Sequence, residues 1–258
     1  MFQLNQASFS IPTATGIRQL LSPISLQFEL GKVYGLIGHN GSGKSTLIKL
    51  MARQQKSSSG QILLNNQAIE HWGSREFARE VAYLPQHLPT NTQLTARELI
   101  ALGRYAWNGL LKSNPQQDQT AVQNALVLTH TEKFADQQID VLSGGERSRI
   151  WLAMLLAQQS RFLLLDEPLA ALDIAHQVEV MQLIKKLSRE LGLGVVIVIH
   201  DVNLAAAFCD ELIALHSGKL LAQGTPEQLI TPDSLQQIYG LQLNVIAHPN
   251  THAPVVFY

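Results

Sequence analysis

The sequence predicts an α/β fold built around a mostly parallel sheet. Short and nearly continuous apolar runs, such as Val33–Ile37, Phe162–Leu165 and Val195–Ile199, are typical of buried parallel strands. Helical stretches lie between these runs, and the longest of them is Ile174–Leu191, which Gly192 is expected to end. Strands that alternate with helices in this way favour one large α/β domain over residues 1–258.

A phosphate-binding loop follows the first buried strand. Residues Gly38–Ser45 read G-x-x-x-x-G-K-S, and the run Thr46–Met51 after them has helical composition. The loop therefore connects a strand to a helix N-terminus, where backbone amides and the helix dipole attract phosphate. Lys44 is expected to reach the β- and γ-phosphates, and the Ser45 hydroxyl to bind Mg²⁺. The motif predicts a P-loop NTPase core, whose nucleotide contacts are Gly38, His39, Asn40, Gly41, Ser42, Gly43, Lys44, Ser45 and Thr46.

The N-terminal residues have a different pattern from the rest of the chain. Residues 2–30 alternate between apolar and polar side chains, with a break at Pro12–Gly16, and this period of two predicts an antiparallel β subdomain. Ser57–Gly60 is expected to be a turn before a strand at Gln61–Leu64. Val81–Leu84 is another short buried strand, ended by Pro85.

A helical subdomain is predicted to interrupt the α/β core. The composition changes over residues 87–141, and with the helix expected at Glu146–Gln158 the insertion extends over about 87–160. Within it, Thr95 and Glu98 have the spacing of a capping box, and Asn114–Asp118 is expected to be a loop. A short helical tail is expected over about 225–258, after a hairpin turn at Ser217–Gly218, with proline in the first turn after each of two N-caps, Thr225 and Thr231.

Charge and cysteine content restrict the function classes. The net charge is −1 and the pI about 6.8, so no overall field favours nucleic acid or an acidic membrane surface. Charged residues make up only 15% of the chain, which suggests that partners cover part of the surface. The only cysteine, Cys209, is expected to be a buried structural thiol in a reduced compartment. Neither a signal peptide nor a run of 18 apolar residues is found.

Two adjacent carboxylates end one of the buried strands. Asp166 and Glu167 follow Phe162–Leu165, and buried carboxylates are costly unless a cation or a proton accompanies them. We expect Asp166 to hold Mg²⁺, directly or through water, and Glu167 to orient the attacking water and accept its proton.

Three other positions could carry chemistry. Leu142–Glu146 contains Ser143, Gly144 and Gly145 before a helix, which makes either a second anion cradle or an ordinary capped turn. His200 follows the strand Val195–Ile199, at the strand end where ligands of α/β sheets bind. Gln86 lies after the strand Val81–Leu84, just before the helical insertion.

Taken together, these residues resemble the ATPases of the ATP-binding-cassette (ABC) family over nearly the whole chain. Gly38–Ser45 resembles the Walker A motif, Gln86 the Q-loop, Leu142–Glu146 the family signature and Phe162–Asp166 Walker B. In the same comparison Glu167 is the catalytic glutamate, Asp173 belongs to the D-loop and His200 is the switch histidine. The resemblance implies that Gln86, Glu167 and His200 act in catalysis, that Gln86 also contacts Mg²⁺ beside Ser45 and Asp166, and that Asp173 contacts nucleotide.

A narrower resemblance is to the ATPases of iron(III)-siderophore importers, especially the ferrichrome or hydroxamate type. It rests on the runs Gly38–Gly41, Ala82–Gln86, Gly103–Trp107, Leu172–Gln177 and Ile238–Gly240. Importers of haem and cobalamin share much of this pattern. Three features depart from the family: Leu169–Ala171 replaces a Thr-Ser-Ala run, Ser148 replaces a common glutamine, and no Tyr or Trp occupies the usual adenine-stacking position before the loop, to which Ile11 is the nearest residue.

The resemblance implies an ATP-driven importer subunit on the cytoplasmic face of the cell membrane. Two copies would enclose ATP head to tail, each ATP lying between Walker A of one copy and Ser143–Gly145 of the other. The helical insertion would dock on a separate membrane permease, which a substrate-binding protein supplies with cargo. Tyr105, Trp107 and Leu110-Leu111 are expected permease contacts, with burial in the core as the alternative. A soluble cassette ATPase acting on nucleic acid or ribosomes is the rival function, disfavoured because the chain has one cassette and no basic patch.

Overall fold

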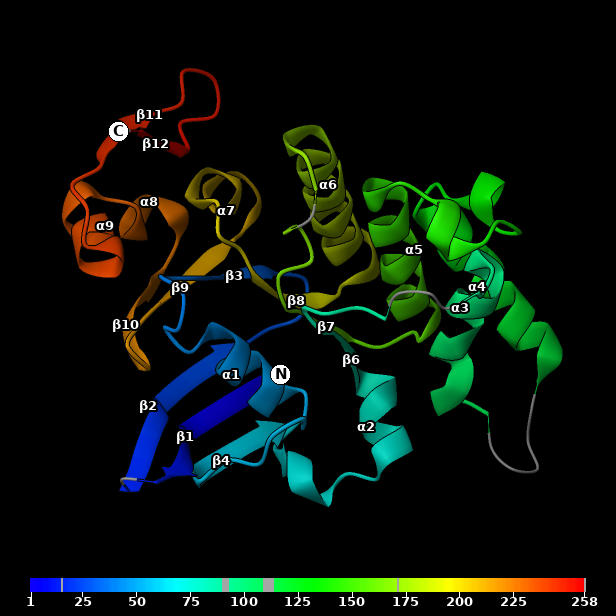
Figure 1. Ribbon diagram of the computed structural model, residues 1–258, viewed down its shortest axis with the longest axis horizontal. Helices are drawn as coiled ribbons and strands as arrows, with labels where there is room; N and C mark the ends of the chain where they lie inside the picture. The colour runs from blue at the N-terminus through cyan, green and yellow to red at the C-terminus, as the bar shows by residue number, and fades with distance from the viewer. Residues whose placement is uncertain (15, 90–92, 109–113, 171, 258) are drawn as a thin grey trace.

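A six-stranded sheet forms the centre of the molecule, with helices on both sides of it (Figure 1). In this computed structural model, residues 1–14, 16–89, 93–108, 114–170 and 172–257 are described. The strand order is β10-β9-β3-β8-β7-β6, and every neighbouring pair except β9–β10 is parallel, as predicted. The strands are β3 (Val33–Ile37), β6 (Val81–Leu84), β7 (Phe162–Leu165), β8 (Gly194–Val198), β9 (Glu211–His216) and β10 (Lys219–Gly224).

A second, antiparallel sheet confirms the predicted N-terminal β subdomain. Its order is β2-β1-β4-β5, with β1 (Phe2–Thr13), β2 (Gly16–Phe28), β4 (Ser59–Leu64) and β5 (Gln67–Ala68). The two sheets share one hydrophobic cluster, to which the buried side of α1 (Lys44–Met51) also belongs. Edge-to-face ring pairs lie in this cluster, with centroids 5.5 Å apart for Phe2 and Phe162. Helix α1 is therefore fixed between the two sheets, and the loop before it starts from a rigid base.

The helices of the predicted insertion lie together at one side of the central sheet (Figure 1). They are α3 (Ala96–Leu102), α4 (Pro115–Leu128) and α5 (Gly144–Ala157), and both α3 and α4 pack against α5. Thr95 caps α3 through the predicted capping box. The loop predicted at Asn114–Asp118 is wrong, because Pro115 begins α4 and the Asn114 side chain accepts a hydrogen bond from the Gln117 amide. An Asn-Pro pair is equally compatible with a turn and with the start of a helix. Packing of the later residues against α5 favours the helix.

Three further helices lie close in sequence to strands of the central sheet. Helix α2 (Ser74–Glu80), which the sequence patterns did not indicate, precedes β6. Helix α6 (Ile174–Leu191) has the predicted bounds, and Gly192 ends it with a φ of 65°. Helix α7 (Val202–Phe208) follows β8 and ends at Cys209, which is buried as predicted. Burial raises the pKa of that thiol, so it stays protonated at neutral pH.

The C-terminal tail is only partly helical, so the prediction of a helical tail over about 225–258 is wrong in its second half. Helices α8 (Pro226–Leu229) and α9 (Pro232–Tyr239) begin with proline as expected. Strands β11 (Asn244–Ala247) and β12 (Pro254–Phe257) then form an antiparallel hairpin. The Asn203 side chain of α7 hydrogen-bonds both backbone groups of Val256, and this distant partner helps to fix the hairpin. None of the helices in the described ranges is long and apolar enough to cross a bilayer.

Candidate active site

The phosphate-binding loop connects β3 to α1, as the motif predicts. Three of its glycines have positive φ: 141° at Gly38, 78° at Gly41 and 105° at Gly43. At Gly38 space is also a constraint, because a methyl group built there would lie 2.2 Å from the Leu215 carbonyl oxygen. The loop can therefore keep this path only with glycine at its start, and its end presents the first amides of α1 to a ligand.

Lys44 folds back over the loop. Its ammonium group donates hydrogen bonds to the carbonyl oxygens of Gly38 at 2.8 Å and His39 at 3.0 Å. The residue is buried, and burial lowers the pKa of the ammonium group. A buried cation that has only neutral partners in hydrogen-bond contact fits an anionic ligand, which would add the missing negative charge.

Asp166 at the end of β7 is the buried carboxylate nearest to the loop helix. Its Oδ1 accepts a hydrogen bond from Ser45 Oγ at 2.8 Å, and the residue has no exposed surface. Burial raises the pKa of Asp166, although the hydrogen bond from Ser45 opposes this. The second oxygen, Oδ2, has no hydrogen-bond partner among the described residues, and neither has Ser42 Oγ. The orphaned carboxylate oxygen of Asp166, beside the Ser45 hydroxyl, fits a site for Mg²⁺, which proteins bind through one or two carboxylates and the substrate phosphates.

Glu167 is held by side chains that follow the ends of two other strands. Its Oε2 accepts a hydrogen bond from Gln86 Nε2 at 2.8 Å, and its Oε1 lies 2.9 Å from His200 Nε2. Strands β6, β7 and β8 are parallel neighbours, so the residues after their carboxyl ends meet at one edge of the sheet. Glu167 itself has a φ of 55°, a costly value for a non-glycine residue that is typical of functional turns. The predicted catalytic residues Gln86, Glu167 and His200 are thus in contact.

The second predicted anion cradle is not part of this cluster. Ser143 is exposed and caps α5, where its hydroxyl and backbone amide bond to Oε2 of Glu146 at 2.8 and 2.9 Å. This capping lowers the pKa of Glu146. Asp173 is the N-cap of α6, and its Oδ1 accepts a hydrogen bond from the His176 amide at 2.9 Å. None of Ser143, Gly144, Gly145 and Asp173 lines the hollow over the phosphate loop of the same chain.

The hollow over the phosphate loop has a wall that sequence reasoning missed. It measures about 210 Å³ and is lined by residues 40–46, Glu167 and two residues of β2, Arg18 and Leu20. Ile11, the residue expected nearest the base, lies opposite Arg18 in the β1–β2 ladder and so on the same face, but it does not line the hollow. No sequence motif identifies Arg18. Its place beside the hollow depends on how β2 pairs with β1, which the sequence pattern does not specify.

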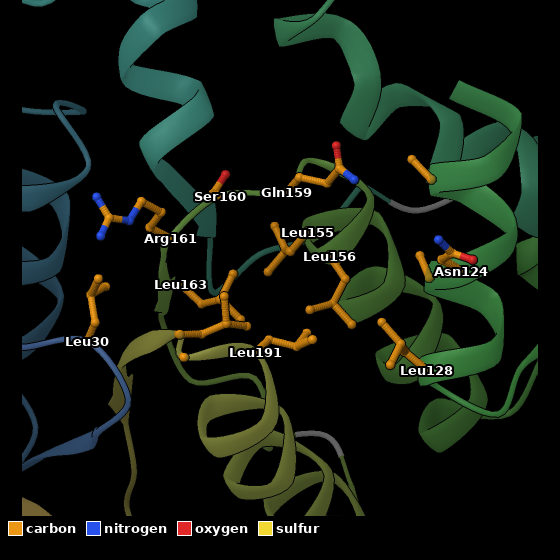
Figure 2. A pocket seen from close by; sticks show the side chains of 14 residues that line it. Leu30, Asn124, Leu128, Leu155, Leu156, Gln159, Ser160, Arg161, Leu163 and Leu191 are labelled. Atoms are coloured by element: carbon orange, nitrogen blue, oxygen red, sulfur yellow. The ribbon is translucent and has the colours of Figure 1, made fainter. Parts of the chain in front are cut away.

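A larger hollow of about 480 Å³ lies at the other edge of the sheet, near the starts of β7 and β8. Figure 2 shows Leu155, Leu163 and Leu191 around it, from α5, β7 and the end of α6. None of the predicted site residues lines it. It lies between the helical insertion and the core, is lined by leucines together with polar residues such as Gln159 and Arg161, and is away from the candidate site.

The aromatic residues expected to meet a partner differ in exposure. Tyr105 is 74% exposed, so the core alternative is wrong for it, whereas Trp107 is 36% exposed. The indole of Trp107 donates to the Gln158 carbonyl at 2.7 Å, and the Arg79 guanidinium lies 4.7 Å from the centre of its rings. Leu110 and Leu111 lie outside the described residues.

This chain is similar to known proteins in both its sequence and its fold. The profile of a family described as ABC transporter matches residues 21–170. The iron(3+)-hydroxamate import ATP-binding protein FhuC of Bacillus subtilis (strain 168) is 38% identical over 93% of this chain and 89% of its own length. The hemin import ATP-binding protein HmuV of Rhodococcus jostii (strain RHA1) is 38% identical over 95% and 83%. Among solved structures, the dimeric bacterial ABC transporter cassette MJ0796 is 26% identical, with a TM-score of 0.77 over 87% of this chain and 98% of that one.

Proposed function

Because the chain belongs to the ABC transporter family, we propose that it is the ATP-hydrolysing subunit of an importer for iron(III)-hydroxamate siderophores. The family assignment confirms the resemblance found in the sequence, and ATPase activity follows from it. One observation carries the catalytic proposal: Gln86 and His200 both contact Glu167, beside the Ser45–Asp166 pair.

The site residues divide the work of hydrolysis between them. The amides of residues 40–46 and the Lys44 ammonium would bind the phosphates, because they supply donors and positive charge at a helix N-terminus. Ser45 and Asp166 would hold Mg²⁺, which when bound neutralises phosphate charge. Glu167 would accept the proton of the attacking water, with Gln86 and His200 keeping the carboxylate in place.

A second copy of the chain would complete each site. Ser143, Gly144 and Gly145 lie outside the hollow of their own chain, and Ser143 is exposed, which leaves this loop free to contact nucleotide bound by another copy. ATP shared between two sets of donors would then favour the closed dimer, since a ligand shifts an equilibrium through its different affinity for the two states. The dimeric form of the solved relative supports this arrangement.

The remaining partner would be an integral membrane permease, on whose cytoplasmic side the subunit is peripheral. The helical subdomain over about 87–160 would dock there, with exposed Tyr105 and the edge of Trp107 as contacts. A substrate-binding protein would deliver the chelate. The hydroxamate relative supports hydroxamate cargo, and the equally identical hemin relative keeps haem as the second candidate.

Uptake measurements test the cargo and the activity together. A strain that lacks this chain should lose ATP-dependent uptake of an iron-labelled hydroxamate, and the wild-type chain should restore it while Glu167→Gln should not. Haem and cobalamin uptake measured in the same strains are the controls. Loss of haem uptake with unchanged hydroxamate uptake would overturn the cargo assignment and leave the ATPase assignment standing.

A further inference from the structure

The loop Ser143–Gly145 is called the signature loop here. Its last residue, Gly145, lies directly against the imidazole ring of His176. A methyl group built on Gly145 would be 2.2 Å from Cδ2 of His176 and 2.9 Å from its Nε2. Gly145 is buried, so the ring rests on its Cα, and the loop has no free space on that side. In a close-packed contact of this kind, the position of the ring determines the position of the loop.

The imidazole is fixed from its other side by Asp173. Its Nδ1 lies 2.8 Å from Oδ1 of Asp173, and the same oxygen accepts the His176 amide at 2.9 Å. The next residue, Gln177, donates hydrogen bonds to the carbonyl oxygens of Leu169 and Leu172 at 3.2 and 3.1 Å. The first turn of α6 therefore holds the segment that follows Glu167 and, through the His176 ring, the loop that contains Gly145.

A second contact between α5 and α6, an ion pair, lies one turn further along both helices. Arg149 Nη1 is 3.7 Å from Glu179 Oε2, and the Glu179 side chain is 53% exposed. A long ion pair with this exposure contributes little to stability and fixes no geometry. Of these two contacts between α5 and α6, the ring contact of His176 is therefore the one that can position the signature loop.

We propose that His176 is a positioning residue for the Ser143–Gly145 loop and thereby controls how tightly a second copy closes on ATP. The inference rests on the proposed function, in which this loop binds nucleotide held by the partner copy. His176 has no contact with the nucleotide hollow of its own chain. Its replacement should therefore weaken pairing of two copies and leave nucleotide binding by one copy unchanged.

The first experiment measures ATP-driven dimer formation in the Glu167→Gln background, which slows hydrolysis. His176→Ala should require roughly tenfold more protein for half-maximal dimer formation, and ATP affinity of the monomer should change by less than about twofold. Gln182→Ala, an exposed position on the same helix, is the matched control. Dimer formation by His176→Ala equal to that of its parent would overturn the proposal. Failure of the proposed function is distinguishable, because the Glu167→Gln parent itself would then remain monomeric with ATP.

Two further variants separate ring packing from a general loss of stability. His176→Phe keeps a ring against Gly145 and should restore most of the pairing, whereas His176→Asn keeps a donor for Asp173 without the ring and should pair as weakly as His176→Ala. Thermal unfolding of all three variants checks that they fold. If His176→Phe pairs no better than His176→Ala, the ring contact does not position the loop.

Hybrid dimers, purified through two different tags, test whether His176 acts through the loop of its own chain. A hybrid of Lys44→Ala with His176→Ala keeps one complete site, because the intact phosphate loop and the intact signature loop meet there. A hybrid of wild type with a chain carrying both substitutions has no complete site. We expect the first hybrid to hydrolyse ATP several-fold faster than the second. Equal rates would contradict an action of His176 through its own signature loop.

Discussion

His200 Nε2 lies 2.9 Å from Oε1 of Glu167, while Gln86 donates to the other carboxylate oxygen at 2.8 Å. Both oxygens of the expected general base are thus engaged, and the Glu167 side chain is only 14% exposed. A carboxylate held at both oxygens has a fixed orientation, and each oxygen keeps a second lone pair for a water molecule. This geometry supports the proposal that Glu167 accepts the proton while Gln86 and His200 orient its carboxylate.

Glu167→Gln should bind ATP and hydrolyse it about 10²- to 10⁴-fold more slowly, the usual cost of losing a general base. The amide cannot accept the proton, but it has nearly the same shape, so the phosphate loop stays intact. Size-exclusion chromatography with ATP should show the variant accumulating as a dimer. Turnover close to wild type would remove Glu167 from the role of base.

Ser143→Arg should leave ATP binding by the monomer nearly intact and abolish dimer formation and turnover. The reason is that Ser143 is exposed and does not line the nucleotide hollow of its own chain. Mixing it with Lys44→Ala should recover part of the turnover, since one composite site then keeps both elements. If Ser143→Arg weakens ATP binding by the monomer as severely as Lys44→Ala does, the assignment to the partner's site is wrong.

Gly38→Ala should abolish nucleotide binding, because its methyl group would lie 2.2 Å from the Leu215 carbonyl oxygen at a φ of 141°. Gly192→Ala is a matched control: its φ is 65°, and no atom lies within 4 Å of the added methyl. This control should lose about 1–2 kcal/mol of stability through backbone strain alone and keep its ATP affinity. Equilibrium nucleotide binding and thermal unfolding of both variants test this prediction. Normal nucleotide binding by Gly38→Ala would contradict the steric requirement for glycine.

Asp166→Asn should raise the thermal stability of the metal-free protein while it abolishes Mg²⁺-dependent hydrolysis. Burial raises the pKa of Asp166 above its usual value, so the ionised carboxylate costs folding free energy at neutral pH. That cost falls as the pH decreases through the raised pKa and is absent in the neutral amide. The gain in melting temperature should therefore be larger at pH 7 than at pH 4. A variant less stable than wild type at pH 7 would show that the Ser45 contact outweighs burial.

Selectivity for ATP over GTP should be weak, with dissociation constants that differ by less than roughly tenfold, or about 1.4 kcal/mol. Beyond the loop the hollow presents Arg18 and Leu20, and neither side chain offers an acceptor for the amino group of adenine. Ile11→Tyr should tighten nucleotide binding by about 0.5–1.5 kcal/mol through ring stacking, because Ile11 shares a face with Arg18. Competition binding with both nucleotides measures this; a much larger preference for ATP would indicate a base-reading contact elsewhere.

Local sequence determined the features whose partners lie nearby in the chain. Helix α6 starts and ends at the predicted residues because its N-cap, Asp173, and its terminating glycine, Gly192, act within one turn. The hairpin at Ser217–Gly218 follows from the same kind of local preference, since both residues have positive φ. The phosphate loop is local in its glycine backbone angles and in the hydrogen bonds of Lys44, whereas the close approach at Gly38 depends on the distant Leu215.

Only the tertiary structure decided which of these parts meet. Gln86, Glu167 and His200 come together because β6, β7 and β8 are neighbours in the sheet, an order that depends on long-range packing. The same holds for Arg18 beside the phosphate loop, for the hairpin β11–β12 fixed by Asn203, and for the His176 ring against Gly145. The free energies of helix caps and glycine turns depend on residues only a few positions apart. Both features can therefore be inferred from the sequence. Contacts between segments tens of residues apart depend on how whole layers pack, which no local pattern contains.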